Sequence, residues 1–270
     1  MQAISMADGV KIAVYDNRLQ GQETVLLGHG WPLSHKMYEY QIERLSEQRY
    51  HVVAVDLRGF GESDAPARGY SYRQMATDLY RVVRAKQLSN FILVGFSMGG
   101  AIVLRYMNLF RGYGVKKLIL LAAAAPCWTQ RPGFPYGLSR ESVDNLIRLA
   151  ETDRPQLARQ FSHEQLFACP QSEAAKNWFE DISLSASGIG TVRAAISLRE
   201  EDGRADLVAV RVPTWIIRGA KDRVVPAGLT DYQHEHIPGS KLYTLENSGH
   251  GVFYDELEAF QKYFMEAIQH

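Results

Sequence analysis

The chain alternates short apolar runs with longer segments of helical periodicity, and this alternation limits its fold more than any other feature. The apolar runs cover residues 10–15, 24–27, 51–55, 91–94, 117–121, 214–217 and 241–245. Several are apolar throughout, as strands covered on both faces are. Helical patterns follow at residues 36–47, 72–86, 98–110 and 252–268. The alternation predicts a mostly parallel sheet of about eight strands with helices on both faces.

The alternation breaks between residues 126 and 212. This region has no convincing strand, but it has helical patterns at residues 140–150, 153–163, 173–181 and 189–199. It also holds several aromatic residues, Trp128 and Phe161 among them. We expect residues 126–212 to form a helical cap inserted between two strands of one α/β core, which comprises residues 1–125 and 213–270.

Charge and cysteine content narrow the class of protein. The 30 Lys and Arg residues balance 30 Asp and Glu residues, which argues against nucleic acid or an anionic membrane as a partner. Cys127 and Cys169 have no metal-type spacing, so free thiols in a reducing compartment are expected. No signal peptide and no apolar run long enough to span a membrane are found, so we expect a cytoplasmic protein. Whether it forms a homo-oligomer stays open.

The stretch GFSMGG at residues 95–100 carries the first chemical signal. Ser97 lies between Gly95 and Gly99, after an apolar run and before a helical pattern. Gly-x-Ser-x-Gly in this context is typical of a nucleophile elbow, where a strained turn exposes the serine. Close packing of the strand into the helix is the structural alternative for the glycines. The context favours Ser97 as a nucleophile.

A serine hydroxyl needs a base, and the base needs an orienting acid. His250 follows the last apolar run in the glycine-flanked loop NSGHG, so it can reach the same edge of the sheet. Asp222 follows the run at 214–217, whereas Asp202 and Asp206 precede that run. Ser97, His250 and Asp222 are therefore the predicted catalytic residues.

An acyl-transfer transition state carries an oxyanion that needs two positioned donors. The backbone N–H of Met98, at the start of a helix, is one candidate. The other is the N–H of Trp31 in the loop HGWP, where Gly30 allows close approach. We expect His29 to order this loop by hydrogen bonding. Phe96 and Trp128 are expected to border the substrate pocket.

The segment DLRGFGES at residues 56–63 is rich in glycine, but its spacing fits no phosphate-binding motif. We interpret it as a structural loop whose Asp56 and Arg58 hold the backbone.

Taken together, HGWP, DLRGFGES, GFSMGG, GAKDRVVP at 219–226 and NSGHG at 247–251 resemble the α/β-hydrolase superfamily over nearly the whole chain. Within it the chain is most similar to cofactor-free serine esterases, the group of the non-haem haloperoxidases, perhydrolases and arylesterases. The resemblance implies the α/β-hydrolase fold and no metal or organic cofactor. It also disfavours dehalogenase and epoxide-hydrolase chemistry, because those relatives have an aspartate where this chain has Ser97.

The resulting hypothesis is a serine hydrolase that cleaves small carboxylic esters through an acyl-enzyme, with lactones or amides as further substrates. A perhydrolase or haloperoxidase side activity is implied by the resemblance. Three alternatives stay open: a carbon–carbon bond hydrolase of the same fold, a methylesterase or thioesterase acting on a carrier-bound substrate, and a small-molecule receptor that retains the triad.

Overall fold

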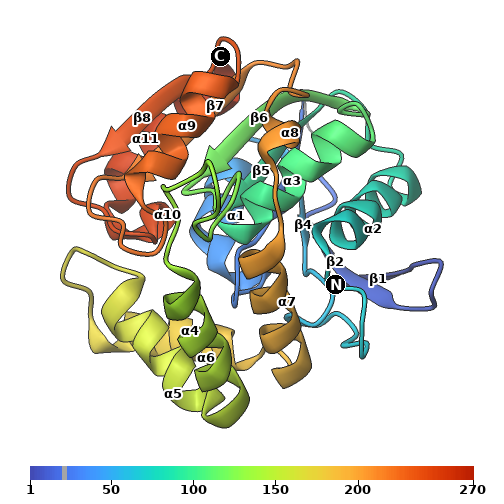
Figure 1. The fold of residues 1–270 in the computed structure, drawn as a ribbon. Coiled ribbons are helices and arrows are strands. Elements are labelled where there is room, and N and C mark those ends of the chain that lie inside the picture. Colours follow the sequence, from blue (N-terminus) through green and yellow to red (C-terminus); the bar gives the residue numbers. More distant parts are fainter. Residues whose placement is uncertain (20–22) are drawn as a thin grey trace.

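The structure, a computed structural model, describes residues 1–19 and 23–270. Within these residues the chain forms an eight-stranded sheet in the order β1-β2-β4-β3-β5-β6-β7-β8 (Figure 1). β1 pairs with β2, and β2 with β4, in antiparallel fashion, and the remaining pairs are parallel. The strands are β1 Gln2–Ser5, β2 Lys11–Asp16, β3 Thr24–Gly28, β4 His51–Val55, β5 Phe91–Phe96, β6 Val115–Leu121, β7 Thr214–Gly219 and β8 Lys241–Leu245. The predicted fold class is confirmed.

The helices occupy most of the segments with helical periodicity. They are the 3₁₀ turn η1 His35–Tyr38, α1 Glu39–Glu47, α2 Tyr72–Ala85, α3 Met98–Leu109, α4 Arg140–Thr152, α5 Arg154–Gln160, the π-helical turn η2 Phe161–Gln165, α6 Glu173–Leu184, α7 Gly188–Glu200, α8 Arg204–Leu207, α9 Ala227–His236, α10 Val252–Asp255 and α11 Leu257–Gln269. Serine caps start several of them. Ser71, Ser139, Ser172 and Ser187 each accept a backbone N–H of the first turn, which is the preferred role of serine at that position.

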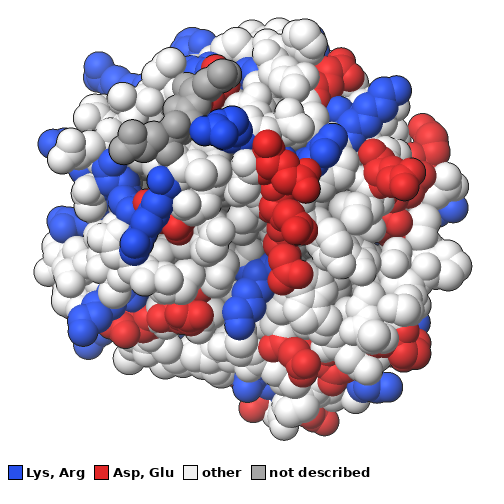
Figure 2. All heavy atoms as spheres, turned by 180° about the vertical axis from the view of Figure 1, so that it is seen from behind, with Lys and Arg blue, Asp and Glu red and all other residues white. Residues whose placement is uncertain are grey.

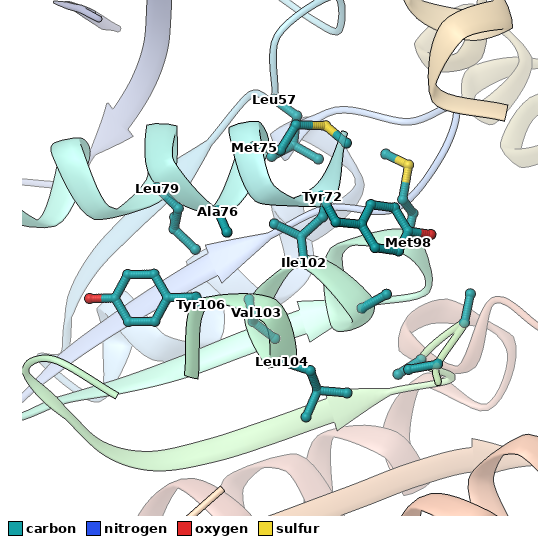
Figure 3. Packing of buried hydrophobic residues seen from close by; sticks show 14 of the residues in the cluster. Leu57, Tyr72, Met75, Ala76, Leu79, Met98, Ile102, Val103, Leu104 and Tyr106 are labelled. Atoms are coloured by element: carbon teal, nitrogen blue, oxygen red, sulfur yellow. The ribbon is translucent and has the colours of Figure 1, made fainter. Parts of the chain in front are cut away.

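The apolar strands bury one row of side chains on each face of the sheet, because successive residues of a strand point to opposite sides. On one face Leu93 and Leu120 pack with α2 and α3, and Figure 3 shows Tyr72 of α2 beside Met98 and Ile102 of α3. On the other face the strands pack with α1 and with the phenylalanines of α11. Two separate apolar layers therefore fix the sheet between its helices.

The segment between β6 and β7 contains α4 to α8 with η2. In Figure 1, α4, α5, α6 and α7 gather beyond one edge of the sheet, below it in that view. Among the described residues, this segment adds no strand to the sheet, although short isolated bridges join Thr129 to Leu138 and Arg131 to Phe134. The division into a core and a cap of residues 126–212 stays a prediction.

Several elements differ from the sequence-based expectation. The final helix is interrupted at Glu256, so α10 and α11 replace one helix over residues 252–268. The first helix begins as the turn η1, whose Ser34 cap accepts the Lys36 N–H. The elements β1, α8 and most of α9 were not predicted. β1 is short and mostly exposed, and α9 has polar residues around much of its circumference, so neither has a strong periodic pattern.

Charged side chains are mixed over the face that Figure 2 shows, where a column of acidic residues lies among basic ones and uncharged areas separate the groups. Within residues 1–19 and 23–270, no helix has both the length and the apolar character needed to cross a bilayer.

Candidate active site

Ser97 lies at the junction of β5 and α3 with φ 51° and ψ −119°, an uncommon conformation for a residue with a side chain. The turn is possible because its neighbours are glycines. A Cβ on Gly95 would lie 2.7 Å from the Gly99 carbonyl oxygen, and a Cβ on Gly99 would lie 2.4 Å from the His29 carbonyl oxygen. The turn thus presents the serine hydroxyl beyond the end of the sheet.

The three predicted catalytic side chains meet at this point. His250 Nε2 lies 3.0 Å from Ser97 Oγ, and His250 Nδ1 lies 2.8 Å from Asp222 Oδ2. Ser97 is 5% exposed, and His250 is fully buried. Since the Asp222 carboxylate accepts at Nδ1, the proton of a neutral imidazole resides there and Nε2 is free to accept the serine proton.

The acid and the base are held independently of each other. Asp222 Oδ1 accepts the backbone N–H groups of Val224 and Val225, both at 2.8 Å, so the carboxylate has one fixed orientation. The His250 ring lies against Phe96, with 4.8 Å between ring centroids. Rigid placement of this kind is what nucleophilic catalysis by serine requires.

The two predicted oxyanion donors, the N–H groups of Trp31 and Met98, belong to segments that adjoin Ser97. A Cβ on Gly30 would lie 2.8 Å from Ser97 Cβ, so the Gly30–Trp31 peptide passes close to the serine. In the described part of the chain, neither the Trp31 N–H nor the Met98 N–H donates to another group. Both donors therefore remain available for an oxygen bound next to Ser97.

His29 fixes the direction of the Gly30–Trp31 peptide. Its Nε2 accepts the Leu57 N–H at 2.9 Å, so its Nδ1 must carry the proton that reaches the Gly30 carbonyl oxygen at 2.8 Å. Leu33 N–H donates to the same oxygen at 2.9 Å. Because the peptide is planar, holding its oxygen also directs the Trp31 N–H. Complete burial lowers the pKa of His29, which favours this neutral form.

In the 56–63 loop Asp56 holds the backbone, as predicted, whereas Arg58 acts differently from the expectation. Asp56 accepts the N–H groups of His35 at 2.7 Å and Glu62 at 2.9 Å. Burial acts to raise the pKa of Asp56, but the hydrogen bond from His35 holds it below its usual value. Within residues 1–19 and 23–270, Arg58 donates to no backbone group; its buried guanidinium pairs with the carboxylates of Asp78 and Asp8.

A cavity of about 580 Å³ opens beside the site, between α4, α5, η2 and the loop that carries Asp222. Its lining consists of Trp31, Trp128, Leu138, Ser142, Asn145, Leu146, Leu149, Leu157, Gln160, Phe161, Glu164, Gln165, Arg223 and Val224. The aromatic and leucine side chains make most of it apolar, which is usual for small-molecule sites. Phe161 links the cavity to the base, since its ring centroid lies 6.5 Å from that of His250.

Of the two expected pocket residues, one lines the cavity and the other does not. Trp128 lines it, with its indole N–H donating to the Val224 carbonyl at 2.8 Å. Phe96 is not among the lining residues; it is completely buried, with its ring against those of His250 and Phe253. The physical reason is strand alternation, which turns Phe96 to the same face of the sheet as Ile92 and Val94.

The alternative acids are engaged elsewhere. Asp206 binds Arg105 and Asn108, and Asp202 binds Arg204. Across the residues that the structure describes, no three His, Cys, Asp or Glu side chains are grouped in a way that would hold a metal ion.

One residue of the site was not anticipated from the sequence. Asp255, at the end of α10, accepts the Gly249 N–H at 2.5 Å, directly before His250. No periodicity or motif marks it; only its position five residues after a candidate base could have suggested it.

Comparison with known proteins agrees with the fold. The family described as alpha/beta hydrolase fold matches residues 23–257. The chain belongs to this family, and it is an enzyme of the hydrolase type in the group that contains esterases and non-haem haloperoxidases.

Individual relatives support the family assignment. The chain is 46% identical to the AB hydrolase superfamily protein YisY of Bacillus subtilis over 87% of each chain. An esterase from Exiguobacterium antarcticum has 43% identity, covers 100% of this chain and 99% of its own, and superposes with a TM-score of 0.96. A bromoperoxidase from Bacillus anthracis has 31% identity and a TM-score of 0.92, with coverage of 97% and 96%.

Proposed function

We propose that the protein is a serine hydrolase of small carboxylic esters that acts through an acyl-enzyme. The observation that carries this proposal is the continuous hydrogen-bonded chain from Ser97 Oγ through His250 to Asp222, at 3.0 and 2.8 Å. A nucleophile, a base and an orienting acid in this geometry are the parts that acyl transfer requires. The esterase from Exiguobacterium antarcticum, which is similar along its whole length, supports the choice of reaction.

The proposed reaction has two halves. Ser97 Oγ attacks the acyl carbon as His250 Nε2 takes its proton, and the Trp31 and Met98 N–H groups stabilise the oxyanion. His250 then gives the proton to the leaving alcohol, and an ester bond to Ser97 remains. In the second half His250 takes a proton from water and the hydroxide attacks the acyl-enzyme. His250 then returns the proton to Ser97 Oγ as the bond to the acyl carbon breaks and the acid leaves.

The apolar lining of the cavity supports a modest apolar or aromatic acyl group. Its two tryptophans and leucines offer contact area without a buried charge, while charged Glu164 and Arg223 lie at its exposed rim. The same site supports a peroxide-dependent side reaction, in which hydrogen peroxide replaces water and the acyl-enzyme yields a peracid. Relatives named bromoperoxidase and putative non-heme chloroperoxidase favour this second reaction.

A substrate panel tests the proposal against its alternatives. Wild type and Ser97→Ala are assayed with p-nitrophenyl acetate and butyrate, with a carrier-bound methyl ester and with a ring-cleavage diketone. We expect rapid multiple turnover on the simple esters and none in the variant. Turnover of the diketone alone would establish the carbon–carbon bond hydrolase instead, and stoichiometric binding without turnover would establish the receptor.

A further inference from the structure

The buried carboxylate of Asp255 joins the His250 loop to the segment that follows η2. Its Oδ2 accepts the backbone N–H of Gly249 at 2.5 Å and that of Ala168 at 2.7 Å. Its Oδ1 accepts the Cys169 N–H at 2.8 Å and Gln171 Nε2 at 3.2 Å. Asp255 is only 7% exposed. One carboxylate thus satisfies three backbone donors from two segments that lie about eighty residues apart in the sequence.

The contact between the two segments continues on the other side of His250. Gly251 N–H donates to the Leu166 carbonyl oxygen at 2.6 Å. A Cβ on Gly249 would lie 2.9 Å from Ala168 N, and a Cβ on Gly251 would lie 2.8 Å from the Phe167 ring. The glycines on either side of His250 therefore permit contact too close for any other residue.

Neither of these contacts touches Asp222 or Ser97, so they act on the base alone. His250 lies between two residues whose N–H groups are both held, one by the Asp255 carboxylate and one by Leu166. The bond from Gly249 to the Asp255 carboxylate is charge-assisted, and such hydrogen bonds are among the stronger ones in proteins. Through these hydrogen bonds, residues 166–171 bind the residues on either side of His250 rather than the triad side chains. They nevertheless help to fix the position of the base.

We propose that Asp255 is a positioning residue, which keeps His250 within reach of the Ser97 hydroxyl by joining the base loop to residues 166–171. This inference rests on the proposed function, in which His250 accepts the serine proton.

The test compares Asp255→Ala, Asp255→Asn and Gln171→Ala. Asp255→Ala removes all four hydrogen bonds and frees the base loop, so kcat for p-nitrophenyl butyrate should fall by about 30- to 100-fold with KM within about threefold, the sensitivity expected for a displaced catalytic group. Asp255→Asn keeps one oxygen that can accept from Gly249, but its NH₂ group then faces the Cys169 N–H, so it should recover only part of the activity, with kcat about five- to tenfold below wild type. Gln171→Ala is the matched control: it removes one partner of the carboxylate and leaves the Gly249 bond, so kcat should not change.

A spectroscopic measurement separates positioning from general destabilisation. The hydrogen-bonded Nδ1 proton of His250 should give a downfield proton resonance in wild type and Gln171→Ala that is shifted or lost in Asp255→Ala. Normal kcat and an unchanged resonance in Asp255→Ala, with only a lower melting temperature, would overturn the inference. If Asp255→Ala does not fold, Asp255→Asn decides: a kcat within twofold of wild type together with an unchanged resonance overturns it.

Labelling by a p-nitrophenyl alkylphosphonate distinguishes the two levels of failure. If wild type is not labelled at Ser97, the proposed function fails. If wild type is labelled and Asp255→Ala is labelled at the same rate, only the positioning role of Asp255 fails.

Discussion

Replacing Asp222 by asparagine tests how the acid controls the tautomer of His250. In wild type, Oδ1 accepts two backbone N–H groups, from Val224 and Val225, and Oδ2 accepts from His250 Nδ1. In the variant the amide oxygen must choose between these two sets of donors. If it keeps the two backbone donors, its NH₂ group faces Nδ1, and the imidazole then carries its proton on Nε2 and cannot accept from Ser97.

The structure sets the size of the effect. Turning the amide over restores the correct tautomer but leaves two buried N–H groups unpaired, at about 1–3 kcal/mol each, or about 2–6 kcal/mol together. Since about 1.4 kcal/mol corresponds to a tenfold change in rate, the active orientation should be about 30-fold to about 10⁴-fold depleted. We expect kcat to fall by that factor while KM and the melting temperature change little.

The assay is steady-state hydrolysis of p-nitrophenyl butyrate by purified wild type and Asp222→Asn. Asp231→Asn is the matched control, because Asp231 pairs with Arg218 on an exposed face and carries no catalytic contact. Exposed ion pairs contribute little, so its kcat should stay within about twofold of wild type. A kcat for Asp222→Asn within tenfold of wild type would refute the reasoning, because another carboxylate would then have to serve His250.

Three further predictions follow from single contacts. Gly30→Ala places a Cβ 2.8 Å from that of Ser97 and should lower kcat/KM by about 10²-fold without unfolding the protein. Gly188→Ala is its control, because a Cβ there meets nothing within 4 Å, and its kcat/KM should equal that of wild type. Burial lowers the pKa of His29 from 6.5, so on acidification the unfolded chain takes up this proton before the folded protein does, and the free energy of unfolding falls as the pH drops below about 6.5. The decrease in melting temperature between pH 7 and pH 5 should therefore be smaller for His29→Gln than for wild type. Trp128→Leu should enlarge the cavity, so that it accepts a longer acyl chain. The ratio of kcat/KM for p-nitrophenyl hexanoate to that for p-nitrophenyl butyrate should rise by about fourfold for each methylene newly buried. An unchanged ratio would mean that the acyl group lies elsewhere.

The sequence predicts the sheet and the triad because both depend on local signals that topology brings together. The strands of the central sheet are apolar throughout, and in a parallel sheet their carboxyl ends meet at one edge. Ser97, Asp222 and His250 each follow such a strand, so their proximity needed no knowledge of side-chain packing. His29 was also identified correctly, since a buried loop of this kind must satisfy its backbone groups.

What the sequence did not predict depends on long-range contacts or on weak patterns. Asp255 binds segments that are distant in the sequence, so no local pattern identifies it. The π-helical turn that brings Phe161 to the cavity was expected only as part of a continuous helix. Phe96 is different, because counting by two from Ile92 along the strand would have placed it on the face away from the cavity.

The most direct test of the proposed mechanism is the site of covalent modification. Wild type and Ser97→Ala are treated with a p-nitrophenyl alkylphosphonate, and intact and peptide masses are measured. The mechanism predicts one phosphonyl group per chain, attached to Ser97, with matching loss of ester hydrolysis, and no adduct in the variant. Esterase activity or labelling retained by Ser97→Ala would contradict it.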